Sequence, residues 1–156
     1  MKPNTASKRF TVIIVTLTVL MTIFIFVHSM LPADLSSRES GFFGNLIAGF
    51  FRLFGFSRTQ GEHILRKLAH FSEFTVLGGL LTSCAYCFNR VRPWEFLFRI
   101  LFGGLLTAVT DETIQLFSAG RAGMIADVWI DFSGVVFGTM IMLLFYRIIR
   151  KVKNIR

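Results

Sequence analysis

The chain has 156 residues, of which 53% are hydrophobic and 19 are Phe, and its formal net charge is +8. Ordinary soluble domains average about 45–50% apolar residues, so this composition excludes that class and is typical of an integral membrane protein. Because the basic residues flank the apolar segments, where they interact with lipid headgroups, the positive charge does not indicate a nucleic-acid partner.

Four apolar segments predict transmembrane helices, because a span needs about 20 mostly apolar residues. They cover approximately residues 10–27, 68–88, 96–115 and 128–146. The first follows a basic stretch but lacks a small-residue cleavage site, so we interpret it as a retained anchor. The connections are too short for a soluble domain. We therefore expect an all-α integral membrane protein, a bundle of four transmembrane helices in a single domain over residues 1–156.

Lysines and arginines are distributed unequally between the two sides that these spans define. Eleven of the 17 lie before the first span, around the loop between the second and third, or after the fourth, and the other six lie on the opposite side. The positive-inside rule therefore predicts that both termini are cytoplasmic. Eight of the nine carboxylates then lie on the outer side.

Residues 42–56, between the first two spans, are aromatic, carry only Arg52 as a charge and are too short to span. Phe43, Ile47, Phe50 and Phe54 recur at helical spacing, which predicts an interfacial or re-entrant amphipathic helix. It either anchors the chain in the outer leaflet or forms an apolar wall that admits lipid tails to a neighbouring site.

Polar side chains gather at the outer ends of spans two, three and four. They are Lys67, His70 and Glu73, then Asp111, Glu112 and Gln115, then Arg121 in a glycine-flanked loop, and finally Asp127 and Asp131. An ionisable group near the centre of a membrane helix costs at least ~2.5–3.5 kcal/mol, so such groups usually mark function. We expect these side chains to converge into one site at the outer end of the bundle.

The role of each cation stays open at this level. The guanidinium of Arg121 suits bidentate binding of a ligand carboxylate or phosphate, but pairing with Asp127 or Glu112 is equally consistent with the sequence. Lys67 either contacts a ligand or extends toward water and pairs with Glu73. A purely structural network of ion pairs is the alternative for the whole cluster.

The start of the fourth span has a regular geometry. Asp127, Asp131, Gly134 and Gly138 are separated by four, three and four residues, so they share one stripe of the helix. The Gly-x-x-x-Gly pattern predicts close packing of a neighbouring helix against this stripe.

Together these motifs resemble the VanZ-like membrane proteins of bacteria. The matching pieces, in order, are Lys67-x-x-His70-Phe71, Asp111-Glu112-x-x-Gln115-x-Phe117, Arg121 with Asp127 six residues later, Asp131, Gly134 and Gly138. The stretch from His28 to Pro32 is similar to the family's segment after its first span, which adds Ser29 to the candidates. Asp131 replaces the Asn of many members and adds a charge. The resemblance implies the bacterial cytoplasmic membrane, an envelope context and a link to teicoplanin resistance, but no reaction.

Two classes of function remain open. The first is an envelope protein whose outward-facing pocket binds an anionic lipid, a lipid-linked wall precursor or a glycopeptide. Its ligand-binding residues would be Lys67, Arg121, Gln115, Glu73, Asp127, Asp131 and Ser29. The second is a membrane-embedded enzyme acting on a lipid phosphate or ester, with His70 as acid or base and Asp111 and Glu112 beside it.

The sequence assigns no metal and no cofactor, because it contains no His-x-x-x-His motif. A divalent cation held by Asp111, Glu112 and Asp127 is the alternative. The expected partners are membrane lipids, together with the wall precursor or glycopeptide of the first class. The sequence does not predict an oligomeric state.

Overall fold

The computed structural model describes residues 5–31 and 57–154, and within these ranges every long element is a helix. The helices are α1 (Lys8–Met30), α4 (Arg58–Phe88), α5 (Leu97–Gln115) and α6 (Ile125–Asn154), with a short 3₁₀ turn, Pro93–Phe96, before α5. The interfacial helix predicted at residues 42–56 lies outside the described residues.

Three of these helices are long and apolar enough to cross a membrane. The qualifying stretches are Lys8–Met30, His63–Phe88 and Ile125–Val152. The third expected span, α5, is not among them because Arg99, Asp111 and Glu112 fall within its 19 residues. The described residues are therefore helical as predicted, and three helices have the length and composition of membrane spans.

Helix α4 begins ten residues before residue 68, where hydropathy placed the start of the second span. Ser57 is the N-cap: its side chain accepts from the Gln60 backbone N–H, and the Gln60 side chain accepts from the Ser57 backbone N–H. This capping box lets the helix begin in a polar stretch. Hydropathy does not detect this stretch, because it identifies only apolar segments. As a result, Lys67 and His70 lie inside the helix rather than at its first turn.

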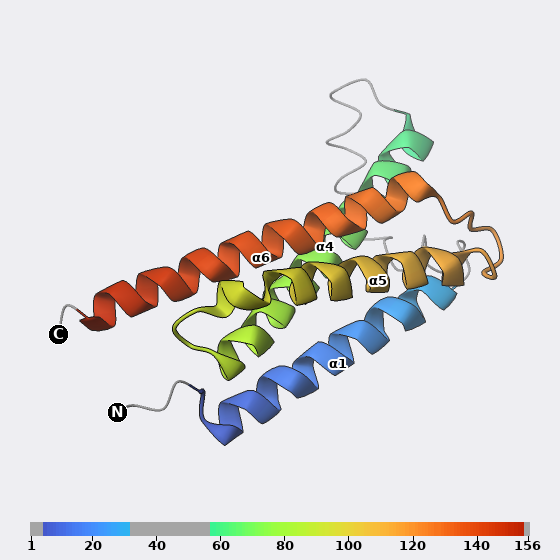
Figure 1. Cartoon of the computed structure of the whole chain (residues 1–156). Helices are drawn as coiled ribbons and strands as arrows, with labels where there is room; N and C mark the ends of the chain where they lie inside the picture. Colours follow the sequence, from blue (N-terminus) through green and yellow to red (C-terminus); the bar gives the residue numbers. More distant parts are fainter. Residues whose placement is uncertain (1–4, 32–56, 155–156) are drawn as a thin grey trace.

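The four helices run in alternating directions (Figure 1). Helices α1 and α5 run toward one end of the molecule, and α4 and α6 start at that end and run back. The start of α1 and the end of α6 therefore lie at the same end. We call the other end, where α1 and α5 finish, the polar end.

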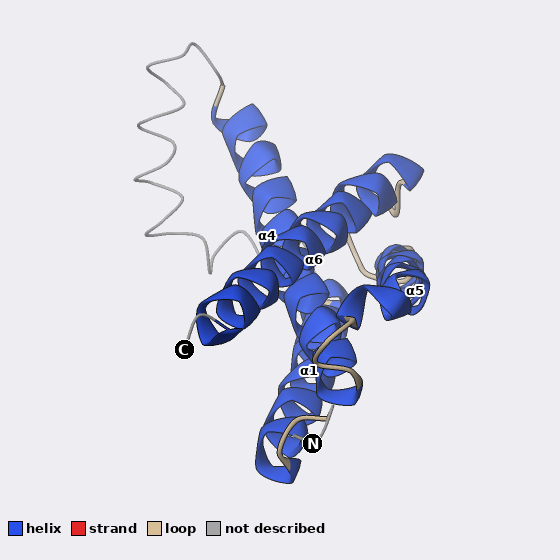
Figure 2. Cartoon of the chain, turned by 60° about the vertical axis from the view of Figure 1, so that its left-hand side comes forward, coloured by secondary structure: helices blue, strands red, loops and turns tan. Residues whose placement is uncertain are grey.

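The most extensive helix contact is the crossing of α4 and α6, visible in Figure 2. A Cβ atom built on Gly134 would lie 2.5 Å from the Phe71 carbonyl oxygen, and one on Gly138 would collide with the Thr75 carbonyl oxygen. From the other side, a Cβ on Gly78 would collide with the backbone of Val135. The close packing predicted from Gly-x-x-x-Gly is confirmed, and it fixes both backbones next to the polar end.

Candidate functional site

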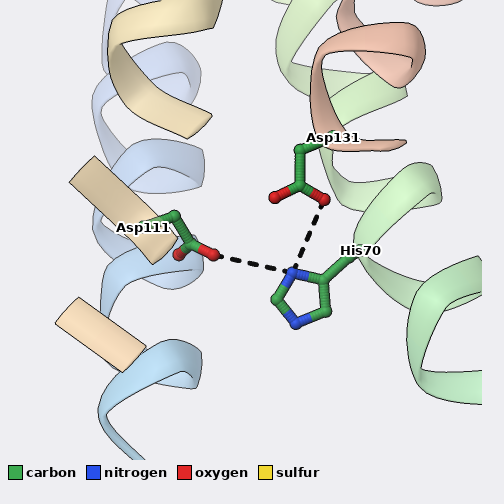
Figure 3. A group of neighbouring side chains, drawn as sticks. All are labelled: His70, Asp111 and Asp131. Carbon is green, nitrogen blue, oxygen red and sulfur yellow. Dashed lines mark ion pairs between the residues drawn. The ribbon is translucent and has the colours of Figure 1, made fainter. Parts of the chain in front are cut away.

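The centre of the polar end is a buried group of three side chains from three helices: His70 of α4, Asp111 of α5 and Asp131 of α6. Each is less than a tenth exposed. Figure 3 shows both carboxylates pointing toward the same imidazole nitrogen. Nδ1 of His70 lies 3.6 Å from Oδ2 of Asp111 and 3.8 Å from Oδ1 of Asp131.

Asp111 is held in place by hydrogen bonds from two other side chains. The hydroxyl of Ser29, at the end of α1, donates to Oδ1 at 2.5 Å, and Nε2 of Gln115 donates to Oδ2 at 3.0 Å. The hydroxyl of Ser118 in turn donates to the backbone oxygen of Ser29 at 2.8 Å. Ser29, a candidate from the resemblance alone, therefore contacts the centre of the cluster directly.

Glu112 shares the Gln115 donor with Asp111 and connects α5 to the start of α6. Its Oε1 accepts from Nε2 of Gln115 and its Oε2 accepts from the Met124 backbone N–H, both at 2.9 Å. A Cβ on Gly123 would collide with the Glu112 carbonyl oxygen, so this close approach requires glycine there. Glu112 is thus occupied by intramolecular hydrogen bonds.

Lys67 pairs with Asp127 and not with Glu73. Its Nζ lies 2.7 Å from Oδ1 of Asp127, which sits in the first turn of α6. Oε1 of Glu73 instead lies 2.9 Å from Nδ1 of His28 on α1. The His28 ring also stacks on His70, with ring centroids 5.9 Å apart. His28 was missed as a site residue by the sequence reasoning, although it is the one ionisable side chain in the last turn of α1.

Arg121 is a buried cation that donates no hydrogen bond from its guanidinium to any described residue. The residue is only 8% exposed. None of its three guanidinium nitrogens has a hydrogen-bond partner among the described residues. Gly120, whose φ of 74° favours glycine, lets the loop turn immediately before it. The sequence left open an internal pair of Arg121 with Asp127 or Glu112, and neither pair forms between the described side chains. Oδ1 of Asp127 instead lies near Nζ of Lys67, and Oε2 of Glu112 accepts from the Met124 backbone N–H.

Burial lowers the pKa of the Arg121 guanidinium, and the positive charge of Arg66 lowers this pKa further. The nearby carboxylates of Asp111, Glu73 and Glu112 raise it and offset part of that effect. Since the ordinary pKa of arginine is above 12, the side chain stays charged at neutral pH. The site therefore contains a buried positive charge whose hydrogen-bond donors are unused.

The cavity between these groups is small. It has a volume of about 10 Å³ and is lined by Arg66, Lys67, His70, Glu112, Gln115, Asp127, Ile130 and Asp131. That is about the space for one water molecule, so a larger ligand group has to enter from the surface or displace side chains. A cavity of about 800 Å³ lies elsewhere, between α1, α4 and α6, and none of the predicted site residues lines it.

These features define the class: an all-helical membrane protein whose apolar helices enclose a cluster of ionisable side chains at one end. The family model described as VanZ/LLP1 matches residues 13–146, a range that includes every residue of this cluster. The chain belongs to the VanZ/LLP1 family, which confirms the resemblance found in the sequence. No curated protein and no solved structure matches the chain.

Proposed function

We propose that this chain is a multi-pass protein of the bacterial cytoplasmic membrane whose polar end faces outward and binds an anionic group. The group belongs to an anionic lipid, a lipid-linked wall precursor or a glycopeptide. Family membership supports the envelope context. The excess of basic residues near the start of α1 and the end of α6 supports cytoplasmic termini, which puts the polar end on the outside.

Helix α5 serves as the fourth span in this proposal. Its 19 residues extend about 28 Å at 1.5 Å per residue, close to the thickness of the hydrocarbon core of about 30 Å. Asp111 and Glu112 are two of the three charged residues that exclude α5 from the candidate spans. Both are buried inside the protein and do not face lipid. Arg99 lies at its other end, where a cytoplasmic headgroup layer would accommodate it.

The observation that carries the binding proposal is the unpaired guanidinium of Arg121. A buried charge without a partner costs several kcal/mol, and breaking a buried ion pair by removing one member costs about 3–5 kcal/mol. Binding of an anionic oxygen to Arg121 would offset part of this free-energy cost. A planar guanidinium also suits a phosphate or carboxylate better than the point charge of lysine does.

The test compares Arg121→Lys with the wild type as purified, detergent-solubilised protein. The probes are phosphatidylglycerol, undecaprenyl pyrophosphate and teicoplanin, with phosphatidylcholine as the lipid without net charge. A ligand at 100 times its Kd stabilises the folded state by about 2.7 kcal/mol, so the correct probe raises the wild-type Tm measurably. The probe that does so identifies the source of the anionic group.

Arg121→Lys should fold and lose most of this shift, because lysine keeps the charge but not the bidentate geometry. Arg99→Lys is the matched control, since Arg99 is exposed and remote from the polar end, and its shift should equal that of the wild type. The proposal is wrong if no anionic probe raises the wild-type Tm, or if Arg121→Lys responds as the wild type does.

A further inference from the structure

We propose that His70, Asp111 and Asp131 form a binding site for a divalent transition-metal ion such as Zn²⁺ or Mn²⁺ (Figure 3). Each residue offers one ligand atom, and the three atoms lie within 4.8 Å of one another. They come from α4, α5 and α6, so an ion here would join three helices. This proposal goes beyond the anion site at Arg121 and does not depend on it.

The distances around Nδ1 of His70 fit a shared ion better than hydrogen bonds. The separations of 3.6 Å to Asp111 and 3.8 Å to Asp131 exceed the 2.7–3.2 Å of an N–H···O hydrogen bond. Metal–nitrogen and metal–oxygen bonds of about 2.0–2.2 Å at tetrahedral angles place neighbouring ligand atoms ~3.4 Å apart. Small side-chain movements would therefore complete the coordination.

The carboxylate of Asp131 supplies an independent reason to expect a ligand. The residue is 1% exposed, and neither of its oxygens has a hydrogen-bond partner in the described part of the chain. A buried carboxylate normally has a cation or several hydrogen-bond donors around it. Figure 3 shows this side chain directed at His70 and at the space between the two carboxylates.

The surroundings of Asp111 resemble the outer shell of a metal site. Ser29 and Gln115 each donate a hydrogen bond to one of its oxygens and so fix the orientation of the carboxylate. Such partners orient metal ligands and contribute to affinity. Asp111 keeps lone pairs on both oxygens for coordination, because each oxygen accepts a single hydrogen bond from these two side chains.

The net charge of the cluster is consistent with a bound divalent ion. Among the described residues, its five carboxylates are Glu73, Asp111, Glu112, Asp127 and Asp131, and its three basic side chains are Arg66, Lys67 and Arg121. With both histidines neutral, two positive charges are missing. One divalent ion supplies both, and so would two bound protons, which makes the metal content of the protein the deciding measurement.

The ligand set differs from the alternative considered from the sequence, which was Asp111, Glu112 and Asp127. Glu112 and Asp127 are occupied by Met124 and Lys67, whereas His70 and Asp131 have no such partners. An imidazole with two carboxylates suits Zn²⁺ or Mn²⁺ better than Ca²⁺, which prefers oxygen ligands throughout. Three protein ligands also leave at least one coordination position for water or an anionic oxygen.

The test measures metal bound to the full, tag-free chain in detergent. Protein stripped with a chelator is equilibrated with Zn²⁺ or Mn²⁺, passed through a desalting column and analysed by elemental mass spectrometry, and its Kd is measured by competition with a chromogenic chelator. We expect one ion per chain. Asp131→Asn should lower the affinity at least ~100-fold, because it removes a direct ligand, and even outer partners contribute 10–100-fold.

Two further variants separate this site from other sources of binding. His63→Gln removes an exposed histidine and should leave stoichiometry and affinity unchanged, which excludes surface binding. Asp127→Asn should also retain one ion, whereas it would lose the ion if the set were Asp111, Glu112 and Asp127. The proposal is overturned if the wild type holds less than a tenth of an ion per chain, or if Asp131→Asn binds as the wild type does.

Discussion

The hydroxyl of Ser29 donates a 2.5 Å hydrogen bond to Oδ1 of Asp111, across 82 positions of the chain. Both residues are fully buried. This contact joins the end of α1 to the carboxylate at the centre of the polar end. Most side chains of α1 are exposed, so this hydrogen bond is one of the contacts that fix the end of α1 to the rest of the protein.

Ser29→Ala should destabilise the protein by about 1–2 kcal/mol. Hydrogen bonds between membrane helices average about 0.6 kcal/mol and reach about 1.7, and this one is expected near the upper limit because its acceptor is a buried carboxylate. Reversible unfolding in mixed micelles measures the difference. Ser72→Ala is the control, since Ser72 is exposed and bonds only to its own helix at Leu68. Equal stability of the two variants would contradict the role given to Ser29.

Gly138→Ala should destabilise the α4–α6 crossing by about 1–3 kcal/mol, the usual cost of an added methyl group in a close-packed interior. The new Cβ would collide with the Thr75 backbone, which cannot move as a flexible side chain can. Gly103→Ala is the matched control in α5, because nothing lies within 4 Å of its Cβ position. That variant should gain about 0.5–1 kcal/mol of helix stability. Relative to the wild type, the changes in the free energy of unfolding should therefore have opposite signs for the two variants.

The Lys67–Asp127 pair should show a coupling energy of about 1–3 kcal/mol in a double-mutant cycle with Lys67→Met and Asp127→Asn. Both side chains are mostly buried and only 2.7 Å apart, so solvent screens the pair less than it screens a surface pair. Each single variant leaves one buried charge unpaired, and the double variant leaves none.

The comparison for this cycle is Arg92–Glu95, which is 63% and 47% exposed and should couple by less than about 0.5 kcal/mol. Similar coupling energies for the two pairs would show that Lys67 is free to leave Asp127 at little cost. Lys67 would then be available for ligand binding, the role for which the sequence made it a candidate.

Cysteine labelling in intact bacteria checks the orientation. After Cys84 and Cys87 are replaced by serine, Ala122→Cys in the α5–α6 loop should react with a membrane-impermeant maleimide. Lys151→Cys, near the end of α6, should react only after the cells are permeabilised. Both positions are exposed, so access from one side decides the outcome. The reverse pattern would place the polar end in the cytoplasm.

Much of the candidate site was predictable, because polarity within an apolar helix is a local property. Lys67, His70, Asp111 and Asp131 all stood out in the sequence. The pairing of Lys67 with Glu73, one of the two alternatives for Lys67, does not form for a geometric reason. Six residues on an α-helix turn by about 600°, so the two side chains leave the helix on different sides and meet different neighbours.

The sequence by itself determined the all-helical membrane class, the family and the glycine stripe of α6, since hydropathy, motif spacing and helical period are properties of contiguous segments. The tertiary structure alone decided which side chains meet. It brought His28 to Glu73 and His70, left Arg121 without a partner, and placed Asp131 rather than Asp127 beside His70. These contacts depend on how each helix is rotated and where it crosses its neighbours. That geometry is set by packing between segments far apart in the chain.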